Sequence, residues 1–181
     1  MAMLSIEDRF CSICKRIGKC FELGSAIMRS KEVNEAGYGC MECLAKGRFE
    51  FWHDTDIGML DEHGLTNVYK HNQPPPEGFL DAAVVALRRT PQIVTWQQEL
   101  WLTHCKDFMI YQGTWEPGDF YRNSSNGDGR SLFLEMTDED YAHLWDESLV
   151  ESQSVLKAWH ATYYVFKCRH CGKLKGNWDC D

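Results

Sequence analysis

Long apolar runs and clustered basic residues are both missing from this chain of 181 residues. No apolar stretch approaches the roughly 18 residues that a membrane-spanning helix needs, so we expect no membrane contact. The N-terminal residues lack the basic start and apolar centre of a signal peptide, which favours a cytoplasmic protein. The formal net charge of −8, with a pI of about 5.3, argues against direct nucleic-acid binding, because that normally requires a basic patch.

The short motifs of several common enzyme classes are also missing. The chain has no Gly-x-Ser-x-Gly turn, no phosphate-cradling or dinucleotide-binding glycine loop and no His-Glu-x-x-His pair. Five histidines stand at no familiar metal-ligand spacing, namely His53, His63, His71, His143 and His160. We interpret these five as surface or structural side chains. We predict no catalytic residue and expect that the protein is not an enzyme.

Nine cysteines are the most informative residues present. Two Cys-x-x-Cys pairs, Cys11 with Cys14 and Cys40 with Cys43, are separated by 25 residues. A two-residue spacer lets one turn direct both thiols at one ion, and two such turns complete a tetrahedral site. Cytoplasmic thiols stay reduced, so this pattern favours a metal over disulfides. We predict a closed, structural zinc site with four thiolates.

A third pair, Cys168 and Cys171, indicates a second zinc site. Its best partners are the adjacent His104 and Cys105, and the alternatives are Cys180, His170 and Cys20. Three cysteines and one histidine would make another closed, structural site, whereas a water in the fourth position would allow catalysis. The competing interpretation of Cys105 is a buried thiol on the apolar face of a helix.

The remaining pattern predicts an α+β fold. We expect a loop-rich, zinc-ribbon-like module over residues 1–72, packed on an α+β portion over 73–181 that has a small antiparallel sheet and short helices. Phe10, Phe49 and Phe51 should pack around the first two cysteine pairs, and residues 51–78 should be irregular. Periodicity and capping residues predict helices over 77–89, 96–104, 137–145 and 149–156. Short apolar runs predict strands over 108–113, 131–135 and 161–167.

Acidic residues gather between positions 135 and 151, with no Lys or Arg at 135–151 and two aromatic residues interleaved. One interpretation is the solvated face of a helix. The other is a docking patch, because acids with exposed aromatic anchors suit a steered protein interface. The residues of this predicted docking patch are Glu135, Asp138, Glu139, Asp140, Tyr141, Trp145, Asp146 and Glu147.

The order of these features resembles the bacterial CbrC-like proteins. The resemblance rests on the paired cysteines and on a block with Thr90-Pro91, Trp96-Gln97, Trp101 and His104-Cys105. An aromatic strand that enters Cys168-Arg-His-Cys171-Gly172 completes it. The match spans most of the chain, although Met41-Glu42 replaces the usual aromatic within the second pair. The resemblance implies tolerance to a DNase-type colicin and a relationship to immunity proteins encoded beside toxins.

These observations predict a zinc-stabilised immunity or tolerance protein that binds and neutralises a basic toxin, in particular a nuclease. Its acidity fits such a partner, since nuclease domains are basic. Two other functions stay open. One is a zinc-dependent enzyme with an open site near Cys105, Cys168 and Cys171, and the other is a zinc-ribbon regulatory adaptor.

Overall fold

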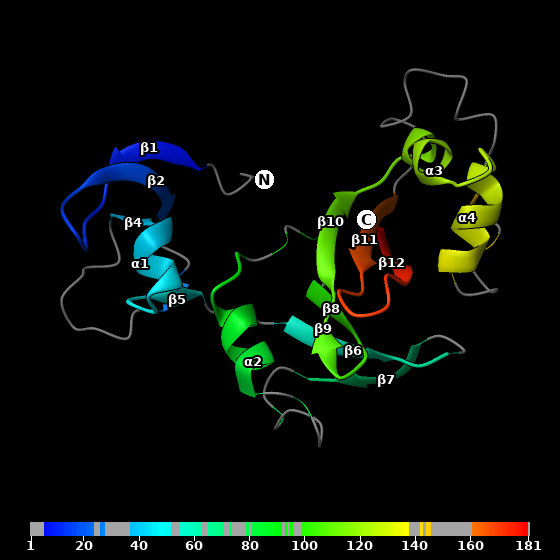
Figure 1. The fold of residues 1–181 in the computed structure, drawn as a ribbon, viewed down its shortest axis with the longest axis horizontal. Coiled ribbons are helices and arrows are strands. Elements are labelled where there is room, and N and C mark those ends of the chain that lie inside the picture. The colour runs from blue at the N-terminus through cyan, green and yellow to red at the C-terminus, as the bar shows by residue number, and fades with distance from the viewer. Residues whose placement is uncertain are drawn as a thin grey trace. The chain divides into compact units, whose positions relative to one another are not determined.

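The computed structural model is mixed α+β, with several small sheets and few short helices, as the sequence predicts (Figure 1). It describes residues 6–23, 26–27, 37–51, 55–62, 65–70, 73, 79, 81–91, 93, 95, 99–137, 142, 144–145 and 161–180. No helix in these ranges is long and apolar enough to cross a membrane.

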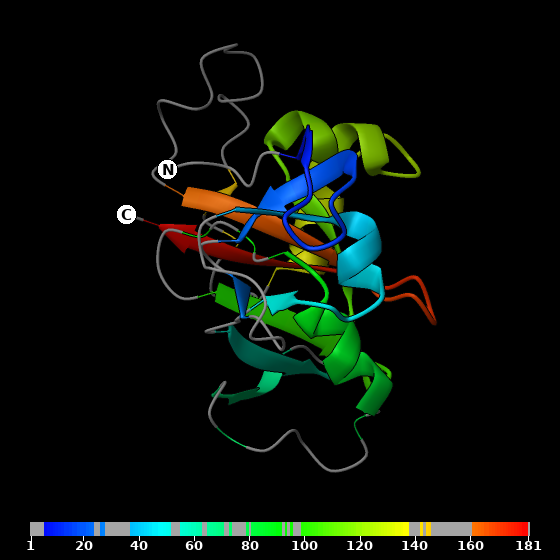
Figure 2. The same ribbon diagram turned by 90° about the vertical axis from the view of Figure 1, so that its left-hand side faces the viewer.

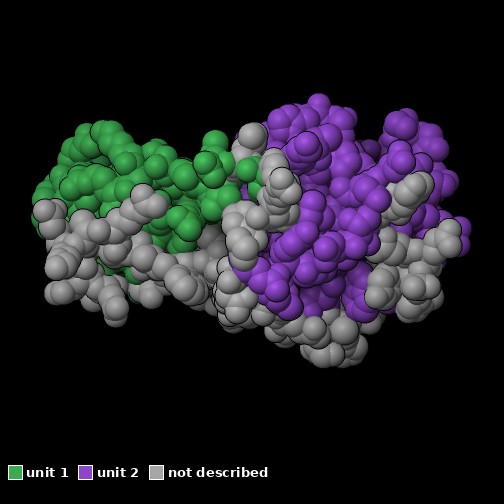
Figure 3. Space-filling view, turned by 90° about the horizontal axis from the view of Figure 1, so that it is seen from below, with its two compact units in different colours: residues 1–54, 77–94 green, residues 55–76, 95–181 purple. Residues whose placement is uncertain are grey.

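The chain divides into two compact units, each made from two stretches of sequence (Figure 3). Unit 1 comprises residues 1–54 and 77–94, and unit 2 comprises residues 55–76 and 95–181. This division differs from the predicted domains 1–72 and 73–181, because residues 55–72 belong to unit 2 and residues 77–94 to unit 1. Each unit therefore contains one group of paired cysteines.

The described part of unit 1 consists of short strands and two helices. Its elements are β1 (Glu7–Phe10), β2 (Ile17–Glu22), β3 (Ala26–Ile27), β4 (Tyr38–Cys40), α1 (Met41–Ala45), β5 (Glu50–Phe51) and α2 (Asp81–Arg88). Antiparallel strands form a sheet in the order β1-β2-β4, and β3 pairs with β5. The core combines the cysteines with aromatic side chains, among them Phe21, Phe49 and Phe51. Phe49 and Phe51 thus pack as predicted, but Phe10 is 56% exposed.

Among its described residues, unit 2 contains a four-stranded sheet, a three-stranded sheet and two helices. Its elements are β6 (Thr55–Leu60), β7 (Leu65–Tyr69), β8 (Glu99–His104), β9 (Asp107–Phe108), β10 (Ile110–Thr114), α3 (Pro117–Asn123), α4 (Gly129–Met136), β11 (Ala161–Lys167) and β12 (Leu174–Cys180). The strand orders are β7-β6-β8-β9, in which β6 and β8 are parallel, and β10-β11-β12, which is antiparallel. Strands β11 and β12, orange and red, lie side by side in Figure 2.

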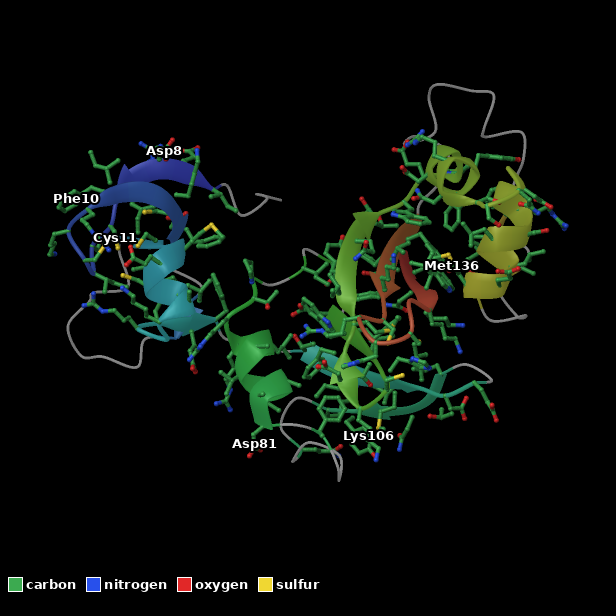
Figure 4. All side chains as sticks on the ribbon, viewed as in Figure 1. Asp8, Phe10, Cys11, Asp81, Lys106 and Met136 are labelled. Atoms are coloured by element: carbon green, nitrogen blue, oxygen red, sulfur yellow. The ribbon has the colours of Figure 1, made fainter. Side chains whose placement is uncertain are left out.

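The strand predicted over 161–167 is confirmed as β11, whose Thr, Tyr, Val and Phe residues favour extended backbone. An aromatic core packs against it. Phe120 from α3 contacts the rings of Trp115, Phe133 and Tyr163 edge-on. Met136, labelled in Figure 4, closes this core from α4.

The helix predicted over 96–104 is wrong, because residues 99–104 form strand β8. This strand lies between β6 and β9, and both Trp101 and the adjacent Leu102 are buried. A strand with both faces buried shows no alternation of polar and apolar residues, so its pattern imitates a short apolar helix. Residues 51–78, predicted to be irregular, likewise contain β6 and β7.

The strand predicted over 131–135 is also wrong, because these residues belong to helix α4. Asp128 caps that helix, and its carboxylate accepts a hydrogen bond from the backbone N–H of Ser131 at 2.9 Å. Phe133 and Met136 are buried at helical spacing. Thr137 follows the last residue of α4 as its C-cap, and its hydroxyl is hydrogen-bonded to the hydroxyl of Tyr163.

The three other predicted helices are described by the structure only in part or not at all. The helix over 77–89 is confirmed in its described part as α2, which starts at Asp81. Most of the helix predicted over 137–145 and all of that over 149–156 lie outside the described residues.

Candidate metal centres

The first two cysteine pairs come from two different local structures of unit 1. Cys11 and Cys14 lie in the turn that joins β1 to β2. In that turn the N–H of Cys11 donates to the carbonyl of Arg16 at 2.8 Å, and the N–H of Lys15 donates to the carbonyl of Cys11 at 2.9 Å. Cys40 ends β4, and Cys43 lies in α1. In Figure 4, yellow sulfur atoms gather beside the labelled Cys11.

The four sulfur atoms have the spacing of a tetrahedral metal site. The Cys11 and Cys43 sulfurs are 3.9 Å apart, and the Cys14 and Cys40 sulfurs are 3.6 Å apart. All four lie within 4.8 Å of one another. A tetrahedron with metal–sulfur bonds of about 2.3 Å has edges of about 3.8 Å. The four side chains can therefore hold a single metal ion.

Backbone N–H groups also point at the sulfur atoms. The N–H groups of Cys14 and Cys40 donate to the sulfur of Cys11 at 3.4 and 3.3 Å. The guanidinium of Arg48 donates to the sulfur of Cys43 at 3.8 Å. Donors of this kind stabilise thiolates and orient metal ligands.

The thiol pKa values show that four thiolates do not coexist easily in this space. Desolvation opposes ionisation of Cys14, but hydrogen bonds from the backbone N–H and side chain of Arg16 lower its pKa to about 6. Burial and then contact with the other three thiols raise the pKa of Cys43 to about 12. A divalent cation removes the repulsion that keeps the last thiol protonated. The electrostatics of the group therefore fit a cation at its centre.

This first group is also part of the unit 1 core. Cys11, Cys40 and Cys43 are 0%, 7% and 2% exposed, respectively. Cys20 is buried in the same core but belongs to neither metal-binding group. Its thiol donates to the carbonyl of Arg9 at 3.3 Å.

The third cysteine pair repeats the first turn in unit 2. Cys168 and Cys171 lie between β11 and β12. The N–H of Cys168 donates to the carbonyl of Lys173 at 2.8 Å, and the N–H of Gly172 donates to the carbonyl of Cys168 at 3.0 Å. These bonds span the same numbers of residues as those of the first turn. Gly172, at φ +79°, takes the position that Lys15 holds at φ +60°.

The other half of the second group is a tight hairpin. Strands β8 and β9 pair at His104 and Asp107, so Cys105 and Lys106 alone form the turn. Both have positive φ, 54° and 62°, as a type I′ turn requires. Such turns normally use Asn and Gly, because other side chains are strained there. The turn brings His104 and Cys105 to the Cys168–Cys171 turn.

His104, Cys105, Cys168 and Cys171 form the second potential metal-binding group. The Nδ1 atom of His104 lies 3.3 Å from the sulfur of Cys105 and 3.3 Å from that of Cys171. All four ligand atoms lie within 4.8 Å of one another. Desolvation opposes ionisation of Cys168, but the N–H of Cys171 and the His104 ring lower its pKa to about 6. Desolvation and its two cysteine neighbours raise the pKa of Cys105 to about 11.

Among the ligands that the sequence allows for the second group, the structure favours His104 and Cys105 over His170. His170 instead faces Asp107, with Nε2 2.9 Å from the buried carboxylate. The guanidinium of Arg169 lies 3.4 Å from the same carboxylate. Asp107 thus ties the Cys168–Cys171 turn to the β8–β9 hairpin. Cys105 is exposed in the turn and is not the buried helical thiol of the competing interpretation.

Asp107 and Arg48 are supporting residues that sequence reasoning missed. Each lies within five residues of a ligand, but neither stands in a motif. The sequence feature that could have identified Asp107 is its position directly after a two-residue turn between two apolar runs. The five other histidines and the side chain of Cys180 lie outside the described residues.

The predicted docking patch is only partly described. Glu135 is exposed on α4. Trp145 is 9% exposed and packs against Phe120 and Phe133, so the prediction of an exposed anchor at this residue is wrong. Burial of its large ring stabilises the core more than exposure would. Asp138, Glu139, Asp140, Tyr141, Asp146 and Glu147 lie outside the described residues.

Fold and sites together define a mixed α+β protein with two groups that can hold a metal ion, one in each compact unit. The model of the uncharacterised protein family UPF0167 matches residues 1–180, so the chain belongs to that family. No solved structure matches the chain.

Proposed function

We propose that the protein is a zinc-stabilised binding protein that neutralises a basic protein toxin, in particular a nuclease. The observation that carries the proposal is the completeness of both metal-binding groups. Each offers four side-chain ligands from the protein. Zinc suits both, because it accepts four thiolates or three thiolates and one imidazole in a tetrahedron.

Metal sites with four protein ligands support a structural role for the metal ions, so the function lies elsewhere on the protein. Four protein ligands leave no position for the water or substrate that a catalytic zinc activates. Both ions would instead hold turns together, one within the unit 1 core and one between two hairpins of unit 2. The function is then expected on the protein surface, which is the usual location of a binding function.

The negative net charge of the protein supports a basic partner, and its distribution favours unit 2 as the surface that binds this partner. Unit 1 has ten basic and ten acidic residues, whereas unit 2 has nine basic and 17 acidic residues. The whole formal charge of −8 therefore belongs to unit 2. When the thiols are counted as neutral beforehand, zinc in the three-thiolate site would add −1 to unit 2, and zinc in the four-thiolate site would give unit 1 a charge of −2. Such a field accelerates the encounter with a positively charged protein.

The resemblance to the CbrC-like proteins supports a toxin as that partner, since it implies tolerance to a DNase-type colicin. The acidic residues at 135–151 supply the predicted contact. Because Trp145 is buried, the proposed contact with the toxin relies on the acidic residues and on Tyr141.

The experiment measures association of the zinc-loaded full chain with a panel of DNase-type colicin domains at low salt. The triple variant Asp138→Asn, Glu139→Gln and Asp140→Asn should associate about tenfold more slowly, because steering falls with charge. A matched triple variant in unit 1, Asp8→Asn, Glu22→Gln and Asp81→Asn, should leave the rate nearly unchanged. Equal rates for both variants would exclude the patch, and binding to no domain of the panel would exclude the function.

A zinc enzyme with an open site is the second candidate, because Cys105 and Cys171 are exposed. In that case a water oxygen would replace His104 as the fourth ligand. Replacement of His104 by Ala discriminates between the two. It should lower zinc affinity strongly if the imidazole is a ligand, and should leave zinc affinity unchanged if water takes that position.

A further inference from the structure

The two metal-binding groups differ in how many of their cysteine residues are exposed. Three of the four sulfur ligands of unit 1 belong to buried residues. In unit 2, Cys168 is 2% exposed, whereas Cys105 and Cys171 are both exposed. Oxidants that attack thiolates select sites by exposure and thiolate character. A metal would keep all of these sulfurs as thiolates, so exposure decides between the groups.

The two exposed cysteines belong to different turns, and their sulfur atoms lie close together. Cys105 is in the β8–β9 turn and Cys171 in the β11–β12 turn. Their sulfur atoms lie within 4.8 Å of each other and each is 3.3 Å from His104 Nδ1. The disulfide bond length is about 2.05 Å, so a shift of less than about 3 Å in two surface turns would join them.

We propose that Cys105 and Cys171 form an oxidation site for hydroperoxides, at which a disulfide replaces the metal of the second group. The proposal rests on the zinc assignment of the proposed function. It adds a chemical class of reagent and a product to that site.

The reaction balances without a further reagent. One exposed thiolate attacks an oxygen of the hydroperoxide, the O–O bond breaks, and the leaving alkoxide or hydroxide takes a proton from water. The resulting sulfenic acid is attacked by the second exposed thiolate, the S–O bond breaks, and hydroxide leaves. Two electrons pass from the two sulfurs to the peroxide. The ion loses two ligands and leaves as a divalent cation, with His104 neutral.

The product should preserve the structure of unit 2. The disulfide joins the same two turns that the metal joins, and the contacts of Asp107 with His170 and Arg169 are untouched. Oxidation would therefore release the metal without separating the two hairpins. A thiol reductant and added zinc would restore the original site.

The test treats the zinc-loaded full chain with hydrogen peroxide at increasing times. A colour indicator measures free zinc, and successive labelling with two isotopic forms of an alkylating reagent identifies each oxidised cysteine by mass spectrometry. We expect release of one zinc per chain, a cross-linked peptide pair that contains Cys105 and Cys171, and oxidation at least about tenfold slower at the unit 1 cysteines. Cys20→Ser serves as a matched control and should change none of these values.

Several results would overturn the proposal. These are equal oxidation rates in both groups, a disulfide between Cys168 and Cys171, and irreversible oxidation without a cross-link. A second variant keeps the test decisive, since Cys171→Ser should leave Cys105 as a sulfenic acid that a 1,3-diketone traps. If the untreated protein holds only one zinc, the zinc assignment of unit 2 fails, but the alkylation ranking still decides the oxidation site.

Discussion

Unit 1 and unit 2 use the same cysteine turn in different ways. In unit 1 the turn of Cys11 and Cys14 is part of a core that consists of cysteines and a few apolar side chains. In unit 2 the equivalent turn has one buried cysteine, Cys168, and one exposed cysteine, Cys171. The described aromatic core around Phe120 includes none of the metal ligands. The comparison indicates that a shared motif does not imply a shared energetic role, because the role depends on what else the unit can bury.

Removal of one ligand from each group should give the largest difference between the units. Cys11→Ser removes a fully buried ligand, so unit 1 should lose its metal and unfold, since structural zinc contributes roughly 10 kcal/mol to folding. Cys171→Ser should weaken metal binding but cost unit 2 only about 2–4 kcal/mol, because the aromatic core remains. Zinc analysis and two-dimensional NMR of the full chain measure both effects.

Cys20→Ser is the control for this pair, because Cys20 is buried beside the first group without belonging to it. It should keep two zinc ions per chain. Complete unfolding of unit 2 in Cys171→Ser would contradict the claim that the two units depend differently on their metal. A Cys11→Ser protein that keeps its zinc and its folded NMR spectrum would contradict it as well.

Two tightly packed glycines should give a smaller effect that does not involve metal. A Cβ at Gly176 would lie 2.0 Å from the Tyr163 ring in unit 2, and one at Gly39 would lie 2.6 Å from the Phe49 ring in unit 1. Each change to Ala should cost about 1–3 kcal/mol, because a buried ring has little room to move. Thermal unfolding measures both, with both zinc ions retained.

Gly18→Ala is the matched control, since a Cβ at this strand position meets nothing within 4 Å. Its melting temperature should stay close to that of the unchanged protein. A cost for Gly18→Ala as large as that for Gly176→Ala would show that loss of glycine itself, and not packing, sets the effect.

The strained turn residues should give the smallest effect, and it should be favourable. Lys15 in unit 1 and Lys106 in unit 2 have φ values of +60° and +62°. Replacement of either by Gly removes the left-handed strain and adds entropy to the unfolded chain, so the net gain should be on the order of 0.5 kcal/mol. A decrease in melting temperature would indicate that the lysine side chains themselves stabilise the turns.

Most of the correct predictions rest on residues that are close together in the sequence. The Cys-x-x-Cys pairs and the adjacent His104 and Cys105 are the residues that the structure brings together. Strand β11 can be predicted because its β-branched and aromatic residues favour an extended backbone. Each of these signals lies within a few residues of chain.

The errors arose where distant contacts decide the outcome. The consecutive residues Trp101, Leu102 and Thr103 of strand β8 are all buried, so both faces of the strand are covered and the alternation that identifies a strand is missing. For α4, the run Leu-Phe-Leu predicts a strand, but Asp128 and Ser131 form the cap of a helix. Trp145 stands among acidic residues in the sequence, yet the rings of Phe120 and Phe133 decide its burial.

The most direct test of the central claim is X-ray absorption at the zinc edge on the fully loaded protein, calibrated for metal per chain. Two closed groups with seven cysteines and one histidine predict two zinc ions per chain. The mean coordination should be 3.5 sulfur atoms at about 2.3 Å and 0.5 nitrogen atoms at about 2.0 Å. One zinc per chain, or a mean below three sulfur atoms with an oxygen ligand, would contradict two closed structural sites.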